Sequence, residues 1–230
     1  MRKAASGEAC GKPLPRSFYA RDPVVVARAL LGRLLVHDSP QGRVSGLVVE
    51  AEAYRGAADP ASHAHRGRTV RNAAMFGDPG HAYVYFTYGM HHCLNLVTGS
   101  EGKASAVLVR ALEPVDGGEF MRERRGGATE LTGLARGPGN VARALGLTRA
   151  HDGLDLVGGP LWLSDLPPRR GGHRVARGPR VGIRVALDRD WRCFLEGHPC
   201  VSAPGGAATR VGRARVGRTR VRRTAAPLRG

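Results

Sequence analysis

The sequence predicts one α+β domain in which helices surround an antiparallel β-sheet and a β-hairpin protrudes from it. First, 230 residues, 42% of them apolar, are enough for one domain with a substantial core. Second, apolar and polar side chains alternate over residues 47–54, which is typical of a strand with one buried face. Third, aromatic and β-branched residues of the segment 83–97 lie on both sides of Gly89, which predicts two antiparallel strands joined by a tight turn.

A leader and a helix are predicted at the beginning of the chain. Residues 1–13 show no periodicity, so we expect them to form a flexible leader. Asp22 is a suitable N-cap and Pro23 suits the first helical position. The apolar residues 24–31 continue the helix until Gly32 ends it. We expect this helix to pack on the sheet.

A second hairpin and a long loop are predicted next. Strands at 34–37 and 44–54 flank the turn-forming residues 38–42. Residues 55–81 then form a polar loop rich in His, Arg and Gly. Loops of this length in a compact domain are usually functional or disordered.

One strand and two short helices are predicted in the middle of the chain. Residues 104–112 form an apolar strand that carries Arg110, and a buried arginine requires an anionic partner. The helices cover 119–125 and 141–145. The second follows a glycine-rich segment, 136–140, that formally matches a dinucleotide-binding pattern. Because no clear strand precedes it and a proline interrupts it, we favour backbone amides that contact a phosphate.

Short strands at 161–163, 180–185 and 191–195 are predicted to complete a domain that spans residues 14–204. Residues 205–230 consist largely of Arg, Gly, Ala, Val and Thr. This composition predicts a disordered basic tail that holds phosphates nonspecifically.

The formal net charge of +17, carried almost wholly by arginine, predicts a polyanionic partner. Nucleic acid is favoured over an anionic membrane, because no segment has about 20 consecutive apolar residues and no basic amphipathic helix stands out. A signal peptide is not recognisable either. We therefore expect a soluble, cytoplasmic protein without a membrane partner.

Two glutamates are candidates for acid–base chemistry. Glu50, Glu52 and Tyr54 share one face of the predicted strand, which separates the two carboxylates by about 7 Å. This spacing matches the acid and the base of an inverting glycosidase, which hold a water molecule between them. The alternative is that both acids are merely solvated on an exposed strand face.

Four of the five tyrosines, Tyr54, Tyr83, Tyr85 and Tyr88, occur in these two segments, although Phe, Trp and Tyr make up only 5% of the chain. Packing in a β-sheet core would explain one or two of them. A cluster beside a carboxylate in a strongly basic chain favours stacking on nucleic-acid bases, which contributes about 1–3 kcal/mol per base.

Other kinds of catalytic site have weaker support. Four histidines suggest a metal site with Cys93, but adjacent strand residues point to opposite faces and no second thiol or carboxylate completes the set. The histidines are His63, His65, His91 and His92. We predict no metal and no cofactor, and the four scattered cysteines are expected to be reduced thiols. The three lysines lie outside these segments, so water is the expected nucleophile.

Several motifs, in order over about residues 14–204, resemble the alkyladenine DNA glycosylase (3-methyladenine DNA glycosylase) family. They are the segments 49–54, 83–90, 93–95, 109–114, 137–139 and 180–183, with His63, Arg71, Asn72, Met75 and Phe76. The resemblance implies a mixed α/β domain around a curved antiparallel sheet. It also implies a monomer that binds the minor groove of duplex DNA and flips alkylated purines such as 3-methyladenine out of the helix. Hydrolysis of the glycosidic bond without lyase activity would then begin base excision repair.

The resemblance also assigns roles to matching positions. It implies that Glu52 is the general base, and that Arg110 and the Val181 carbonyl hold the attacking water. It also implies that Tyr54, His63 and Tyr85 form the walls of the base pocket and that Asn95 excludes normal guanine. Tyr88 and Met90 would act as a wedge that fills the place left by the flipped nucleotide. Asn140 departs from the family pattern, in which a lysine there contacts a phosphate.

Two alternatives are compatible with the residues alone. One is a non-catalytic, basic nucleic-acid-binding protein that uses the tyrosine hairpin as a wedge, in which Glu52 has no chemical role. The other is a hydrolase of free nucleosides or small glycosides that uses Glu50 and Glu52 and does not need the hairpin.

Overall fold

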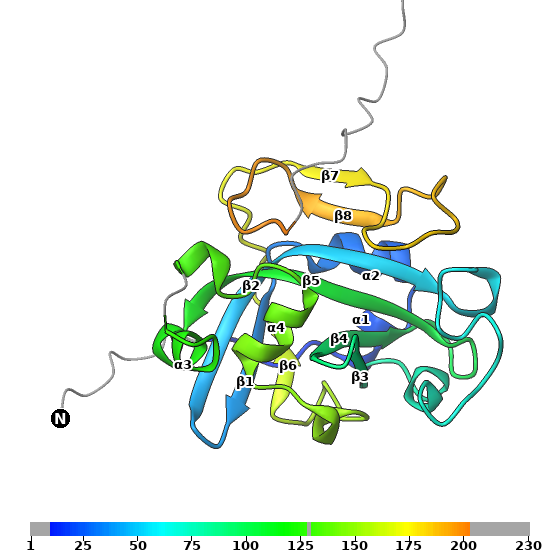
Figure 1. Ribbon diagram of the computed structural model, residues 1–230, viewed down its shortest axis with the longest axis horizontal. Helices are drawn as coiled ribbons and strands as arrows, with labels where there is room; N and C mark the ends of the chain where they lie inside the picture. Colours follow the sequence, from blue (N-terminus) through cyan, green and yellow to red (C-terminus); the bar gives the residue numbers. More distant parts are fainter. Residues whose placement is uncertain (1–9, 128–129, 203–230) are drawn as a thin grey trace, which may run out of the picture.

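A strongly curled antiparallel sheet, with helices packed against it, forms the single mixed α/β domain of this protein (Figure 1). The computed structural model describes residues 10–127 and 130–202. The predicted fold class is confirmed.

The predicted ends of the chain are described only in part. Residues 1–9 of the expected leader and the whole expected tail, 205–230, lie outside the described residues. Residues 10–13 lie against the domain, because the Lys12 amide donates a hydrogen bond to Oδ1 of Asp165 at 2.8 Å. The domain boundaries themselves stay predictions.

The central strand of the sheet is β2 (Gly42–Arg55), which carries both candidate glutamates. The strand order is β3-β4-β5-β2-β1-β6, and β8 pairs with both β2 and β7. The other strands are β1 (Leu34–Ser39), β3 (Ala82–Thr87), β4 (His91–Thr98), β5 (Ser105–Asp116), β6 (Leu161–Leu163), β7 (Val175–Gly178) and β8 (Arg192–Leu195). On one edge β2 pairs with β5; on the other its first half pairs with β1 and residues 50–52 pair with β8. The predicted β1–β2 hairpin is therefore confirmed.

Within the described residues, four short α-helices accompany the sheet. They are α1 (Arg16–Tyr19), α2 (Pro23–Leu30), α3 (Gly118–Arg124) and α4 (Pro138–Leu145), with single 3₁₀ turns η1 (Gly56–Ala58), η2 (Ala73–Phe76), η3 (Leu131–Gly133) and η4 (Arg149–His151). Oδ1 of Asp22 accepts a hydrogen bond from the Val24 amide at 2.9 Å, so the predicted N-cap of α2 is confirmed. Helix α2 packs on β2, and α4 packs on β4 and β5. No helix in the described part of the chain is long and apolar enough to cross a membrane.

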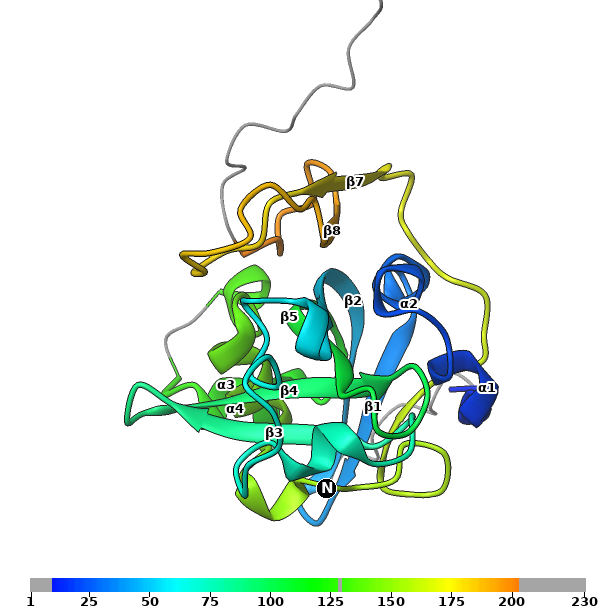
Figure 2. The same cartoon turned by 90° about the vertical axis from the view of Figure 1, so that its right-hand side faces the viewer.

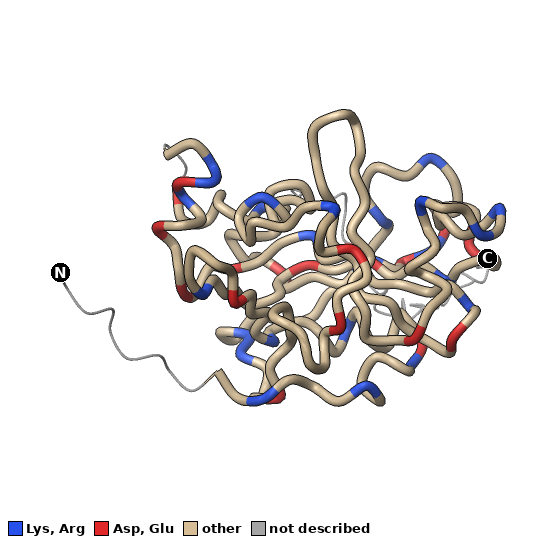
Figure 3. The backbone as a smooth tube through the Cα atoms, turned by 90° about the horizontal axis from the view of Figure 1, so that it is seen from below, with Lys and Arg blue, Asp and Glu red and all other residues tan. Residues whose placement is uncertain are grey.

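The predicted aromatic hairpin is β3–β4, and its tip projects from the domain (Figure 2). Tyr88 and Gly89 have positive φ angles of 51° and 66°, which produce the tight reversal. The side chains of Tyr88 and Met90 are 83% and 69% exposed. In Figure 3 a narrow loop without charged residues projects from the body, and the hairpin has no Lys, Arg, Asp or Glu. Two large apolar side chains are thus presented to solvent.

The strand predicted over residues 180–185 is not formed. The strand of this region is β7, which ends at Gly178, and residues 180–185 run as bends beside β2. The polar groups of this segment are used elsewhere: Arg180 is buried against Asp59, and the amide of Val181 binds a carboxylate on β2. Local alternation of apolar residues does not reveal such partners.

Candidate active site

Glu52 is completely buried and is held by two hydrogen-bond donors and one ion pair. Its Oε1 accepts a hydrogen bond from the Val181 amide at 2.7 Å and lies 3.4 Å from Nη1 of Arg110. Its Oε2 accepts a hydrogen bond from the hydroxyl of Tyr54 at 2.9 Å. The interpretation of this strand face as solvated is therefore excluded, because both Glu50 and Glu52 have no exposed surface.

Burial raises the pKa of Glu52, and this effect exceeds the opposing effects of Arg110, the Val181 amide and the Tyr54 hydroxyl. The charge of Glu50 adds to the increase. A carboxylate with a raised pKa binds a proton more strongly when it is ionised. Glu52 is therefore a better base than a solvated glutamate.

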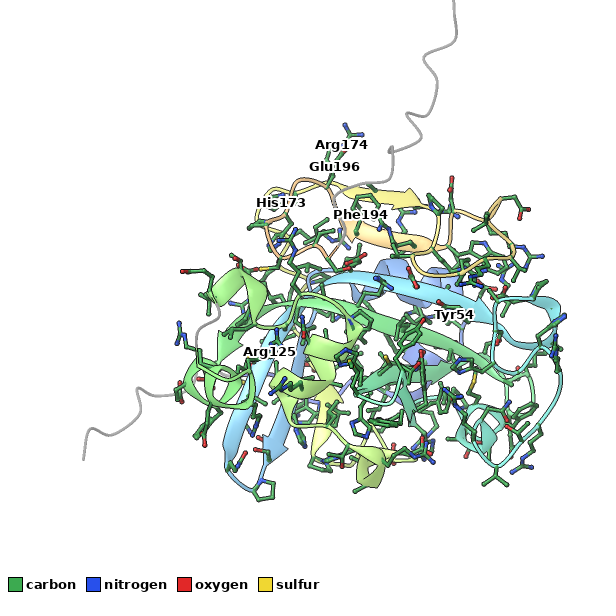
Figure 4. The ribbon with its side chains drawn as sticks, viewed as in Figure 1. Tyr54, Arg125, His173, Arg174, Phe194 and Glu196 are labelled. Atoms are coloured by element: carbon green, nitrogen blue, oxygen red, sulfur yellow. The ribbon has the colours of Figure 1, made fainter. Side chains whose placement is uncertain are left out.

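Tyr54 lies next to Glu52 on the same face of β2, as the alternation predicts. The guanidinium of Arg180 stacks on its ring, 4.7 Å from the centroid. Burial and the adjacent Glu52 charge raise the pKa of Tyr54 well above its usual value, so the hydroxyl stays protonated and can donate. Figure 4 labels Tyr54, which lies below the segment that connects β7 and β8.

Glu50 shares Arg110 with Glu52 and has two further partners of its own. Its Oε1 lies 3.2 Å from Nε of Arg110 and 3.5 Å from Nη1 of Arg192, while its Oε2 accepts a hydrogen bond from the Ser202 amide at 2.8 Å. The β2–β5 register shifts on both sides of Glu50. Both carboxylate oxygens of Glu50 thus have protein partners, which does not favour Glu50 as one member of an inverting pair. The two glutamates also give Arg110 the anionic partners that its burial requires.

A cavity of about 420 Å³ lies in front of these groups. It is lined by Tyr54, Ala61, Ser62, His63, Met75, Tyr83, Tyr85, Thr87, Tyr88, Cys93, Asn95, Leu108, Arg110, Pro138 and residues 181–185. Glu52 is not itself a lining residue. However, its three partners, Tyr54, Arg110 and Val181, all are. The carboxylate therefore lies directly behind the cavity wall.

The aromatic part of the wall is built by β3 and one loop residue. The rings of His63 and Tyr85 meet edge to face with centroids 4.5 Å apart, and those of Tyr83 and Tyr85 are 5.3 Å apart. Nδ1 of His63 lies 3.1 Å from the Tyr83 hydroxyl. Burial and the nearby charge of Arg71 lower the pKa of His63, which is therefore neutral at pH 7. Such a wall can stack against a planar ring.

Asn95 of β4 lies opposite Tyr83 in the β3–β4 register and reaches the same cavity. It is 4% exposed, and its amide nitrogen donates to the Tyr83 carbonyl at 3.3 Å. This hydrogen bond orients the side-chain amide, and the other atoms of the amide are in a position to contact a ligand in the cavity.

The two wedge candidates differ in their relation to the cavity. Tyr88 is a lining residue. Met90 instead lines a neighbouring groove with His91 and Gly139.

Asn140, at the start of α4, donates from Nδ2 to the Arg136 carbonyl at 2.7 Å. In the described part of the chain no three His, Cys, Asp or Glu side chains are grouped as a metal site would require.

The supporting roles of two loop residues were not predicted from the sequence. Nδ2 of Asn72 donates to the carbonyls of His63 and Gly67 at 2.9 and 3.0 Å, which fixes the loop that carries His63. Arg71 lies 5.3 Å from the Tyr85 ring centroid and donates to a carbonyl of the hairpin at 3.1 Å. Both side chains come from the polar loop and belong to the motifs of the resemblance, which gave them no role.

Asp59 and Arg180 form an ion pair with no exposed side-chain surface, which also was not predicted. Arg180 Nη2 donates to Oδ1 of Asp59 at 2.9 Å, and its Nη1 donates to the Ala53 carbonyl at 3.0 Å. The pair fixes the backbone next to Val181. The position of the Val181 amide, and with it that of Glu52, depends on this contact.

Comparison with known proteins gives a consistent result. The sequence model of a family described as methylpurine-DNA glycosylase (MPG) matches residues 17–199. A protein of Streptomyces avermitilis is 50% identical over 197 residues, which cover 83% of this chain and 91% of the relative. One of Burkholderia lata is 48% identical over 199 residues (84% and 93%), and one of Chlorobaculum tepidum is 46% identical over 195 residues (83% and 91%). Each of the three carries the name "Putative 3-methyladenine DNA glycosylase".

Proposed function

Because the chain belongs to the methylpurine-DNA glycosylase family, we propose that it excises alkylated purines, 3-methyladenine among them, from duplex DNA in base excision repair. The resemblance inferred from the motifs is confirmed by this membership. The proposal includes eversion of the damaged nucleotide, water as the nucleophile and no lyase activity.

The single observation that carries the proposal is the position of Glu52 directly behind an aromatic cavity. A purine in a duplex is stacked and cannot reach a buried carboxylate, so the nucleotide must first leave the helix at a cost of a few kcal/mol. The exposed tip residues Tyr88 and Met90 offset part of this cost by filling the vacated place. The cavity volume of about 420 Å³ suits a base with part of its sugar.

The aromatic wall supports selection of alkylated bases. Methylation at N3 or N7 makes a purine cationic, and a cation is attracted to the faces of rings such as Tyr54 and Tyr85. The positive charge also makes the base a better leaving group. Asn95 favours the damaged base in a different way, because it excludes the exocyclic amine of normal guanine.

Hydrolysis follows from the environment of Glu52. The glycosidic bond between C1′ and the purine nitrogen breaks, and its electron pair leaves with the base. A water oxygen bonds to C1′, and the Glu52 carboxylate takes the proton of that water, a role typically worth about 10²–10⁴-fold in rate. The ionised carboxylate also stabilises the positive charge that develops on the sugar. Arg110 and the carbonyl of Val181 hold the water in line.

The function is tested by incubating the full-length protein with methylated duplex DNA. The expected products are free methylpurine and abasic sites that break only after treatment with alkali. Strand breaks formed without alkali would contradict water as the nucleophile. Binding without release of any base would instead support the non-catalytic alternative.

A further inference from the structure

Four charged side chains are buried next to one another behind the cavity. They are Glu50 and Glu52 on β2, Arg110 on β5 and Arg192 on β8, and none is more than 7% exposed. Glu50 and Arg192 are not cavity-lining residues. We propose that these two are positioning residues, which set how much of the positive charge of Arg110 reaches Glu52 and therefore how strong a base Glu52 is. The inference rests on the proposed role of Glu52.

Arg110 divides one guanidinium between two carboxylates. Its Nε lies 3.2 Å from Oε1 of Glu50, and its Nη1 lies 3.4 Å from Oε1 of Glu52. Both carboxylates are fully buried, so water does not screen either interaction. A stronger hold of Glu50 on the guanidinium therefore weakens its interaction with Glu52, and a weaker hold strengthens it.

Arg192 competes with Arg110 for the same oxygen of Glu50. Its Nη1 lies 3.5 Å from Oε1 of Glu50, whose other oxygen is already bound by the Ser202 amide at 2.8 Å. Arg192 is 2% exposed, and its guanidinium stacks 4.5 Å from the ring centroid of Phe194, which Figure 4 labels. Its buried Nε has no hydrogen-bond partner among the described residues. Glu50 is thus the anion that compensates this buried charge.

The strand register places Arg192 close enough to Glu52 for its charge to affect that carboxylate. In the β2–β8 pair Arg192 lies directly opposite Glu52, so both side chains are on the same face of the sheet. The other groups that face Glu52 are Tyr54 on β2 and Arg180 with the Val181 amide on the segment after β7. Changes at Glu50 and Arg192 leave these groups in place.

The proposal predicts opposite effects for two single substitutions. In Glu50→Gln the charge of Arg110 becomes available to Glu52 and that of Arg192 is no longer compensated, so ionised Glu52 is stabilised. In Arg192→Met, Glu50 draws Arg110 to itself, so ionised Glu52 is destabilised. The acid-side midpoint of the pH–rate profile should therefore fall in Glu50→Gln and rise in Arg192→Met, by about one pH unit each.

The measurement is single-turnover release of methylpurine from duplex DNA at saturating protein, as a function of pH. A cationic methylated base leaves without protonation, so the acid-side midpoint reports on the base alone. Arg192→Lys keeps the charge and should retain the wild-type midpoint. Glu50→Gln with Arg192→Met in one chain should give a midpoint between those of the single variants. DNA affinity should change in none of them.

The control for lost stability is Arg16→Met. Arg16 pairs with Asp155 at 2.9 Å, and neither residue lines the cavity. Because this pair is partly exposed, the variant should lower the melting temperature slightly and leave the midpoint unchanged. Either single variant tests the proposal by itself, because each has its own predicted direction of the shift in the midpoint. Unchanged midpoints, or midpoints that move in the same direction, would overturn the inference in an enzyme that still releases base. A wild-type protein that releases no base would contradict the proposed function itself.

Discussion

The backbone amide of Val181 donates a hydrogen bond to Oε1 of Glu52 at 2.7 Å across 129 positions of sequence. The next residue towards the N-terminus, Arg180, is clamped to Asp59 in a fully buried ion pair. The segment after β7 is therefore tied to the central strand at two adjacent residues. Consequently the orientation of the candidate base depends on a loop outside its own strand.

The first prediction concerns the pH dependence of base release. Burial raises the pKa of Glu52. A general base acts in its ionised form, so the rate should fall as the pH falls through this raised pKa. The acid-side midpoint for a cationic methylpurine should lie above about 4.3, the value of a solvated glutamate. A midpoint at or below that value would show that Glu52 is not the titrating base.

The second prediction concerns the ion pair of Asp59 and Arg180. Asp59→Asn should destabilise the fold by about 3–5 kcal/mol at pH 7, because it leaves a buried guanidinium without its anion. Burial acts to raise the pKa of Asp59, but the hydrogen bonds and charge of Arg180 lower it overall. The stabilisation is present above the pKa of the unfolded chain and is lost as the pH falls through the lower folded value. Denaturant unfolding at pH 7 and below pH 4 measures both effects.

The control for Asp59→Asn is Asp38→Asn, which removes the partner of Arg43 from an ion pair whose side chains are 41% and 43% exposed. A pair exposed to this degree contributes at most about 1 kcal/mol. Equal losses of stability in the two variants would contradict the importance given to the buried pair.

The third prediction concerns the tip of the hairpin. Tyr88→Ala removes a ring that is 83% exposed, so its effect on folding should be small. Loss of a stacking side chain costs about 1–3 kcal/mol, and release of base from duplex DNA should fall roughly 5- to 150-fold. Release from single-stranded DNA should change little, because no helix has to be opened there. Tyr88→Phe keeps the ring and should keep the activity; equal loss on both substrates would reject the wedge.

The fourth prediction concerns discrimination between damaged and normal bases. Asn95→Ala removes a side chain that is 4% exposed and lines the cavity. If the amide excludes the exocyclic amine of guanine, this variant should release guanine from undamaged duplex DNA while excision of 3-methyladenine is retained. Release is measured as free base from labelled DNA. A ratio of guanine to methylpurine release equal to that of the wild type would remove Asn95 from this role.

Much of this arrangement follows from local sequence patterns. Alternation along β2 predicts that Glu52 and Tyr54 share a face, and their hydrogen bond of 2.9 Å agrees with it. The aromatic hairpin was predicted from its turn and its β-branched and aromatic residues. The need of Arg110 for an anionic partner was also predicted, because burial of a guanidinium requires one.

Contacts that depend on distant pairing could not be predicted. The environment of Glu50 is set by β8, which brings Arg192 to it from 142 positions away, the difference between residue numbers 192 and 50. Residues 180–185 have the alternation of a strand, but the amide of Val181 is used by a carboxylate and not by a neighbouring strand. Local patterns identify which side chains share a face and give no information on which distant backbone completes the site.

The most direct test of the account is single-turnover release of methylpurine from duplex DNA by Glu52→Gln at pH 7. The substitution keeps the shape of the side chain and removes its ability to take a proton from water. The account predicts a rate about 10²–10⁴-fold below that of the wild type, with the affinity for the same DNA retained. A rate within a factor of two of the wild type would show that the buried carboxylate does not drive the hydrolysis.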